Sequence, residues 1–230
     1  MKRFITLVAL VGLGVASTAW AETREDVQNR LDNATLALHQ IMAAPDNGIP
    51  QEVLEHAKCV AVVPHMIKGG LVFGAENGKG VATCRNENGW SAPAFFAITG
   101  GSWGLQIGVE GADVVMVFQS EKGMQRLEDA KFQLGADASA AAGPVGRHAT
   151  ADTDWKLNTE ILTYSRAKGL FAGLTLTGAD VRRDDSSMEA FYGPDTSTHR
   201  VLRGEVATPA SANPFIDAVR DARAQAIASK

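Results

Sequence analysis

Apolar residues near the start of the chain follow the period of an α-helix. They recur three or four positions apart, on what would be one helix face: Val27, Leu31, Ala34, Leu38, Ile41 and Met42. Thr23-Arg24-Glu25-Asp26 before them resembles a capping box, and Pro45-Asp46-Asn47-Gly48 ends the pattern. The spacing predicts an amphipathic helix over residues 23–42. Its apolar face could pack on the rest of the protein, which we favour, or meet lipid.

In the middle of the chain the pattern changes to that of short β-strands. The continuous apolar run Cys59–Val63, stopped by Pro64, is typical of a buried strand. Further strands are predicted in the segments LVFGA, VATCR, WSAPAFFAIT, WGLQIGVE and DVVMVFQS. Turns are expected between them at residues 76–80, at residues 86–89 and near Gly111. Short strands joined by tight turns predict an antiparallel meander.

The remaining elements complete a mixed fold. Alternation over residues 132–142 predicts a long strand, and ILTYSRAKG with LFAGLTLTGADV predicts a second hairpin. Short helices are expected at residues 50–57, 120–130 and 186–191, and a terminal helix near Asn213 and Pro214. We therefore predict an α+β fold. It is an antiparallel, glycine-rich β meander, able to close into a barrel, with an N-terminal amphipathic helix and a C-terminal helix.

The first 21 residues have the layout of a signal peptide. Lys2 and Arg3 precede an apolar stretch from Phe4 to about Ala16, and Ala19-Trp20-Ala21 supplies a cleavage site. The apolar stretch is short for a membrane span. We expect cleavage after Ala21 and a periplasmic or secreted protein; a retained N-terminal anchor is the alternative.

Removal of the signal peptide makes an acidic chain more acidic. It leaves 209 of the 230 residues and changes the formal net charge from −4 to −6, because Lys2 and Arg3 are lost. That length suffices for one domain with a sizeable core. The acidic balance argues against nonspecific nucleic-acid binding, which needs a basic surface. An anionic ligand would have to find local basic residues.

Cys59 and Cys84 are the two cysteines of the sequence. Two thiols in an exported chain favour a disulfide. Two buried free thiols stay open as the alternative, because the sequence does not determine the Cα separation that a disulfide needs. Neither cysteine lies in a C-x-x-C pair, so no zinc site is predicted.

The segment ITGGSWGL contains the pattern G-x-S-x-G around Ser102, which in α/β-hydrolases forms a nucleophile elbow. An elbow needs a helix directly after the serine, but Trp103, Leu105 and Ile107 alternate with other residues as in a strand. Residues 100–108 also lack the Gly-Lys-Ser/Thr ending of a phosphate-binding loop. The sequence predicts no enzyme, no cofactor and no metal site.

Seven ordered segments resemble successive blocks of the SYLF domain family. They are AKCVAVVP (57–64), KGG (68–70), WSAPAFF (90–96), GGSWGLQIG (100–108), LGADAS (134–139), GPVGR (143–147) and YSRAKGLFAG (164–173). The resemblance covers roughly residues 30–205. We expect a signal peptide (1–21), a single SYLF-like domain (22–206), and a linker with a C-terminal helix (207–230).

This resemblance implies a non-enzymatic lipid-binding domain. Eukaryotic members of the family are similar proteins that bind phosphoinositide membranes, and some also bind actin filaments. A signal peptide would separate this chain from actin, so actin binding is not expected. The expected partner is a phospholipid or membrane surface of the cell envelope. A structural or protein-interaction module of the envelope, with little lipid binding, is the alternative.

Local basic clusters are the candidate site for anionic headgroups, because phosphates bind arginine forks, lysine charges and free backbone N–H groups. The candidate residues are Lys58, Lys68, Arg147, His148, Arg166 and Lys168. Lys58 and Lys68 bracket the first predicted strand. Arg147 and His148 follow a glycine-bounded turn, and Arg166 and Lys168 flank the turn of the second hairpin.

Overall fold

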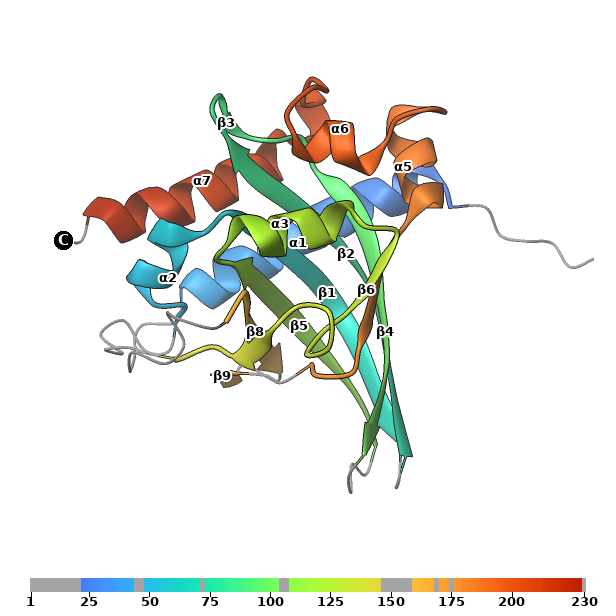
Figure 1. The fold of residues 1–230 in the computed structure, drawn as a ribbon, viewed down its shortest axis with the longest axis vertical. Helices are drawn as coiled ribbons and strands as arrows, with labels where there is room; N and C mark the ends of the chain where they lie inside the picture. Colours follow the sequence, from blue (N-terminus) through green and yellow to red (C-terminus); the bar gives the residue numbers. More distant parts are fainter. Residues whose placement is uncertain are drawn as a thin grey trace, which may run out of the picture.

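The protein is built from one curled β-sheet and a set of helices (Figure 1). The computed structural model describes residues 22–43, 48–70, 73–103, 108–145, 159–167, 170–173 and 176–228. The predicted signal peptide, residues 1–21, lies outside the described residues. Its prediction therefore stays a prediction.

The described strands and helices alternate along the chain. The strands are β1 (Cys59–Gly70), β2 (Phe73–Asn86), β3 (Gly89–Trp90), β4 (Ala94–Trp103), β5 (Gly108–Phe118), β6 (Lys131–Gln133), β7 (Ala140–Ala142), β8 (Ile161–Ala167), β9 (Leu170–Gly173) and β10 (Asp180–Arg183). The helices are α1 (Arg24–Met42), α2 (Gln51–His56), α3 (Glu121–Glu128), α5 (Asp185–Tyr192), α6 (Thr198–Leu202) and α7 (Asn213–Ala228), with a 3-10 helix η1 (Ala210–Ala212). Helices α1, α2, α3, α5 and α7 lie where the sequence predicts them.

Helix α1 begins at the predicted capping box and turns its apolar face inward. The Thr23 hydroxyl accepts a hydrogen bond from the Asp26 N–H at 3.2 Å, and the Asp26 carboxylate accepts one from the Thr23 N–H at 3.0 Å. Leu31 and Ile41 are at most 1% exposed, because α1 packs on β1, β2, α5 and α7. This face therefore belongs to the core, and the lipid-facing alternative for it is wrong.

The sheet has the order β6-β10-β4-β2-β1-β5-β8-β7, with β3 beside β2 and β9 beside β8. All of these pairs are antiparallel except β7 with β8. The predicted α+β class with an antiparallel-dominated sheet is confirmed. Strand β5 pairs with β1 rather than with β4, which departs from a strictly sequential meander and puts β1 at the centre. Among the described strands, the end strands β6 and β7 do not pair, so the curled sheet is open there.

Strand β2 corrects the turn predicted at residues 76–80, because it runs through that segment without interruption. The glycines there make room for neighbouring side chains. A Cβ at Gly78 would come within 2.5 Å of Val63 Cγ1, and a Cβ at Gly80 would overlap the Phe96 ring. A glycine can mark a turn, but inside a strand it can also mark a place where a neighbouring side chain comes close to the backbone. Gly78 and Gly80 are of the second kind.

Two further sequence predictions are wrong for local reasons. Gly111 lies inside β5, so no turn forms there. The long strand predicted over residues 132–142 is instead two short strands, β6 and β7, separated by a turn. In that turn Gly135 adopts a φ of +86°, and the Asp137 carboxylate accepts the Gln133 N–H at 2.8 Å.

Strand β1 does not stop at Pro64 as expected but passes through a β-bulge. Its pairing shifts by one residue between Val62 and Ile67 against β2, and between Val63 and Met66 against β5. His65 takes a φ of 52° there, and its N–H donates to the Asp113 carboxylate at 3.0 Å. Because proline has no N–H, a bulge is a position where a central strand accepts one.

The helices surround the half of the sheet that holds the disulfide. Helix α7 packs on α1 and α2, while α3 contacts β6 and α6, and α6 contacts β4. At the other end, β1, β2, β4 and β5 extend past the helices (Figure 1). None of the helices in the described ranges combines the length and the hydropathy needed to cross a membrane.

Candidate functional site

The structure describes three of the six basic residues predicted to bind headgroups: Lys58, Lys68 and Arg166. Lys58 and Lys68 lie at opposite ends of β1, ten residues apart, which is roughly 30 Å along a strand. Lys58 forms an ion pair with Glu121 of α3 at 2.9 Å. Lys68 stands in register between Glu76 of β2 and Glu110 of β5. These two lysines therefore cannot act on one headgroup.

Arg166 supports the bulge of β1. It stands opposite Asp113 in the β5–β8 ladder, its guanidinium lies 3.8 Å from the Asp113 carboxylate, and it also donates to the Gln40 side chain of α1. Asp113 in turn accepts the N–H of His65. The structure thus gives Arg166 a framework role.

The remaining predicted residues, Arg147, His148 and Lys168, lie outside the described residues. The glycine that opens the Gly143–His148 segment is described, and it has a packing role. Its N–H donates to the Thr163 carbonyl at 2.9 Å, and a Cβ there would overlap the Tyr164 ring. Gly143 therefore offers no free N–H to a phosphate.

The structure also bears on the serine pattern and on metal binding. Ser102 lies in β4, in register with Gly74 of β2, and the next described element is the strand β5. A nucleophile elbow would instead continue into a helix. Among the described residues, no group of three or more His, Cys, Asp or Glu side chains could hold a metal ion.

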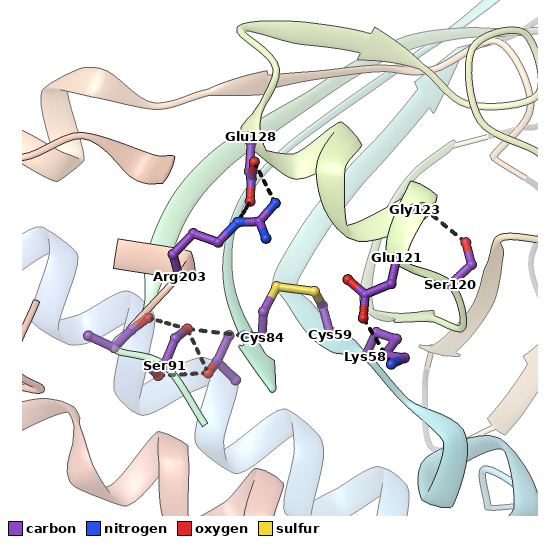
Figure 2. The surroundings of a disulfide bond; sticks show 11 residues. Lys58, Cys59, Cys84, Ser91, Ser120, Glu121, Gly123, Glu128 and Arg203 are labelled. Atoms are coloured by element: carbon purple, nitrogen blue, oxygen red, sulfur yellow. Dashed lines mark hydrogen bonds and ion pairs between the residues drawn. A yellow bond between two sulfur atoms is a disulfide. The ribbon is translucent and has the colours of Figure 1, made fainter. Parts of the chain in front are cut away.

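The end of the sheet near Cys59, the proximal end, is cross-linked and enclosed. Cys59 of β1 and Cys84 of β2 stand directly opposite each other and form the predicted disulfide. Figure 2 shows this bridge beneath α3, flanked by the Lys58–Glu121 ion pair and by the bidentate pair of Arg203 with Glu128, at 2.6 and 3.2 Å. Both sulfurs belong to fully buried residues. The disulfide itself is therefore closed off from solvent.

The opposite, distal end exposes one face of the same strands. Ile67 is 54% exposed, and its register partners Asn77 and Gly111 are exposed too, as are Ala75 and Gly101. Residues directly opposite or two apart share a face of a sheet. The register therefore adds further positions to the face of Ile67, and we call the set the distal face: Ile67, Gly69, Phe73, Ala75, Asn77, Gly101, Trp103, Val109 and Gly111.

The nine positions of the distal face are mostly apolar or small and carry no charge; the next positions on the same side of β2 and β5 are the charged Lys79 and Asp113. Phe73 stands opposite Trp103 at its outer edge. The connecting residues Leu71 and Val72, and Gly104-Leu105-Gln106-Ile107, also carry no charge in the sequence. Contiguous exposed apolar surface on a protein marks an interaction site more often than chance. Chemically, this face can bind an apolar partner.

Sequence reasoning missed the distal face, although a signal was present. Apolar residues flanked by glycines recur in KGGLVFGA and GGSWGLQIGVEG, but the sequence predicts a turn directly after the first stretch and another at the end of the second. Only the register shows that the two stretches lie side by side.

Comparison with known proteins gives a family and several relatives. The family Ysc84, described as "Las17-binding protein actin regulator", matches residues 99–222. This description is of a binding regulator, in agreement with the expectation that the chain is not an enzyme.

The relatives are eukaryotic proteins. The chain is 33% identical to "Protein YSC84" of Saccharomyces cerevisiae over 182 residues, which is 77% of this chain and 38% of that protein. It is 31% identical to human "SH3 domain-containing YSC84-like protein 1" over 170 residues, 73% of this chain and 49% of that protein. It is 30% identical to yeast "LAS seventeen-binding protein 3" over 181 residues, 77% of this chain and 39% of that protein. The match thus spans half or less of each relative.

Proposed function

Because the chain belongs to the Ysc84 family, the SYLF domain family that its sequence blocks resemble, we propose that it is a non-enzymatic protein that binds lipid membranes of the cell envelope. The contact is the distal face. The observation that carries the proposal is one face, exposed and without charged positions, at the end of four paired strands, with Ile67 exposed and Phe73 in register with Trp103. The signal peptide predicted at residues 1–21 would deliver the protein to that compartment.

The composition of the distal face suits the boundary between headgroups and acyl chains. Aromatic residues, tryptophan above all, concentrate at that boundary because they combine an apolar ring with a polar edge. Moving a large apolar side chain out of water contributes about 1.5–3 kcal/mol. Two or three such side chains are enough for reversible membrane association, which is the strength expected of a protein without a membrane-spanning helix among its described residues.

Charge has a smaller part in this proposal than the sequence alone suggested. Of the predicted headgroup ligands, Lys58 and Arg166 are ion-paired with acidic residues, and Lys68 has an acidic residue in register on each side. Recognition of anionic headgroups by Lys68 together with Arg147, His148 and Lys168 would add a salt-sensitive contribution. Apolar contact alone is nearly insensitive to moderate salt.

Flotation with vesicles tests the proposal. Mature protein beginning at Glu22 is mixed with phosphatidylcholine vesicles and with vesicles containing phosphatidylglycerol, at low and moderate salt. We expect binding to both, stronger with the anionic lipid, and largely retained at moderate salt. Binding that disappears at moderate salt would favour the basic residues over the distal face. No binding in any condition would contradict a membrane role.

A matched pair of variants assigns the contact. Ile67 and Leu36 are exposed to 54% and 55%, but Leu36 lies on α1 rather than on the distal face. Ile67→Ser should weaken vesicle binding about tenfold, equivalent to 1.4 kcal/mol, and Leu36→Ser should leave it unchanged. Equal effects of the two substitutions would exclude the distal face as the specific contact.

A protein partner is the second candidate function, because the family description names Las17 binding. In that case the distal face would cover a protein surface of the envelope, and purified protein would not float with vesicles of any composition. Crosslinking from position 67 in intact cells would then give one defined protein adduct, which Ile67→Ser reduces.

A further inference from the structure

Four charged side chains meet beside the start of α1, where β2 continues inward from the distal face. Arg30 lies on the inner side of α1 and is 8% exposed, Asp184 is 5% exposed and Glu22 is 12% exposed, whereas Lys79 of β2 is 42% exposed. Lys79 is two residues along β2 from Asn77, the innermost β2 position of the distal face, and six from Phe73 at its outer edge, which is roughly 20 Å. Two cations and two anions thus form a compact network between α1, β2 and the cap of α5.

Asp184 is a permanent part of this network. Its carboxylate caps α5 by accepting from the Ser187 N–H at 3.2 Å and from the Ser186 and Ser187 hydroxyls at 2.6 Å. It also lies 3.5 Å from Arg30 Nη1 and 3.0 Å from Lys79 Nζ. Arg30 Nη1 donates to the Ser187 hydroxyl at 2.9 Å. These bonds hold the two cations in place.

Glu22 is the second anion that pairs with Arg30 and Lys79. One of its carboxylate oxygens pairs with Arg30 Nη2 and the other with Lys79 Nζ. A guanidinium and an ammonium that grip two oxygens of one anionic group make a typical phosphate or carboxylate clamp. If the Glu22 side chain left, Arg30 and Lys79 would share the Asp184 carboxylate alone, and the net positive charge of this largely buried network would favour another anion.

Glu22 also sits at the edge of an open hollow. The hollow has a volume of about 670 Å³ and is lined by Arg30 and Lys79, by the amides of Asn29 and Asn33, and by His65, among others. Asp26 also lines the hollow, but its carboxylate already accepts the Thr23 N–H in the capping box of α1. The clamp is therefore reachable from solvent, and amide groups stand nearby for further hydrogen bonds.

We propose that Arg30 and Lys79 form a binding site for a phosphate monoester, and that the Glu22 carboxylate is its tethered occupant. Glu22 directly precedes Thr23, the cap of α1, and it would be the first residue after cleavage behind Ala21. A group tethered by one residue acts at a high effective concentration and competes with a free ligand. The site therefore stays closed to weak anions and opens to a ligand that makes more contacts than one carboxylate. This proposal does not depend on the membrane contact of the distal face.

Titration calorimetry with glycerol 3-phosphate tests the site in the mature chain. Glu22→Ala should bind this probe about tenfold more tightly than the wild type, because the tethered competitor is gone. Glu22→Gln should lie between them, since it keeps the side chain and removes its charge. Glu22→Ala combined with Lys79→Met should lose the gain. Circular dichroism melting verifies that each variant is folded.

The outcomes separate the possibilities cleanly. No binding by Glu22→Ala, or equal binding by the double variant, would overturn the proposal and leave an ordinary structural ion-pair network. If Glu22→Ala gains affinity for glycerol 3-phosphate, the site stands. Flotation with phosphatidic acid vesicles then distinguishes the source: a gain there with Glu22→Ala indicates a lipid headgroup, and its absence indicates a soluble phosphate ester. Ile67→Ser should leave calorimetric binding unchanged, which separates this site from the distal face.

Discussion

The two ends of β1 and its neighbours differ both in sequence and in surroundings. At the proximal end, Cys59–Val63 and Val114–Phe118 are at most 1% exposed, so these strands are covered on both faces. At the distal end, alternate residues such as Ile67 and Gly111 are exposed. The bulge at Pro64 and His65 stands between the two ends. The continuous apolar runs thus lie where both faces of the sheet are covered, whereas glycines and charged residues interrupt the strands where one face is exposed.

Glycine shows the same contrast. At Gly80 a side chain would overlap the Phe96 ring, whereas at Gly111 nothing lies within 4 Å of the place where a Cβ would stand. The first glycine is required by packing in the enclosed half of the sheet. The second keeps an exposed surface flat and small.

The largest expected effect falls on the disulfide of the proximal end. It closes a loop across a sequence separation of 25 residues, so replacing both Cys59 and Cys84 by alanine should lower the free energy of unfolding by about 3 kcal/mol. Urea denaturation measures this loss. Vesicle binding should be unchanged as long as the variant is folded. A loss of vesicle binding in the folded variant would mean that the two ends are coupled.

The next effect compares the two glycines. Gly80→Ala should destabilise the protein by about 2 kcal/mol, because the new methyl group must displace the buried Phe96 ring. Gly111→Ala has free space and should change stability by less than about 0.5 kcal/mol. Thermal unfolding of the two variants side by side provides the measurement. Equal destabilisation would contradict the different environments of the two positions.

Acid should weaken the enclosed part of the protein through Asp184. Burial alone would raise the pKa of this carboxyl, but hydrogen bonds from Ser186, Ser187 and Lys79 outweigh it and lower the pKa from 3.8 to about 2. A carboxyl with a lowered folded-state pKa stabilises the protein above its unfolded pKa. We expect about 1–2 kcal/mol from this group above pH 4, lost as the pH falls toward 2.

Asp184→Asn isolates this contribution from those of the other carboxyls. The difference in unfolding free energy between wild type and variant should shrink as the pH falls from 4 to 2. A constant difference over that range would show that the Asp184 charge does not stabilise the fold.

The smallest expected effect is that of Ile67→Ser on stability. Because Ile67 is 54% exposed, the substitution should change the free energy of unfolding by less than about 0.5 kcal/mol, while vesicle binding falls about tenfold. Denaturation and flotation of the same preparation provide both numbers. A marked loss of stability would place Ile67 in the core and remove the contrast between the two ends.

Periodicity and cap residues by themselves determined the local elements. The capping box at Thr23, the apolar stripe of α1 and the helices α2, α3, α5 and α7 could all be predicted, because hydrogen bonds within a few residues control them. The sequence blocks also determined the family, and two cysteines in one chain indicated the disulfide. One conflict visible in the sequence was missed: Arg30 falls on the inner side of an otherwise apolar helix face, which signals a buried ion-pair network.

Only the tertiary structure decided what the glycines and the charges do. Glycines at 78, 80 and 111 are read as turns in the sequence, but they lie inside strands, because neighbouring strands supply the side chains and the space around them. The sequence does not show a partner for Lys58 or Arg166; in the fold, Lys58 pairs with Glu121 and Arg166 lies beside Asp113. The distal face likewise exists only through the pairing of residues far apart in the sequence, such as Ile67 with Gly111. Such contacts depend on long-range register, which no local pattern encodes.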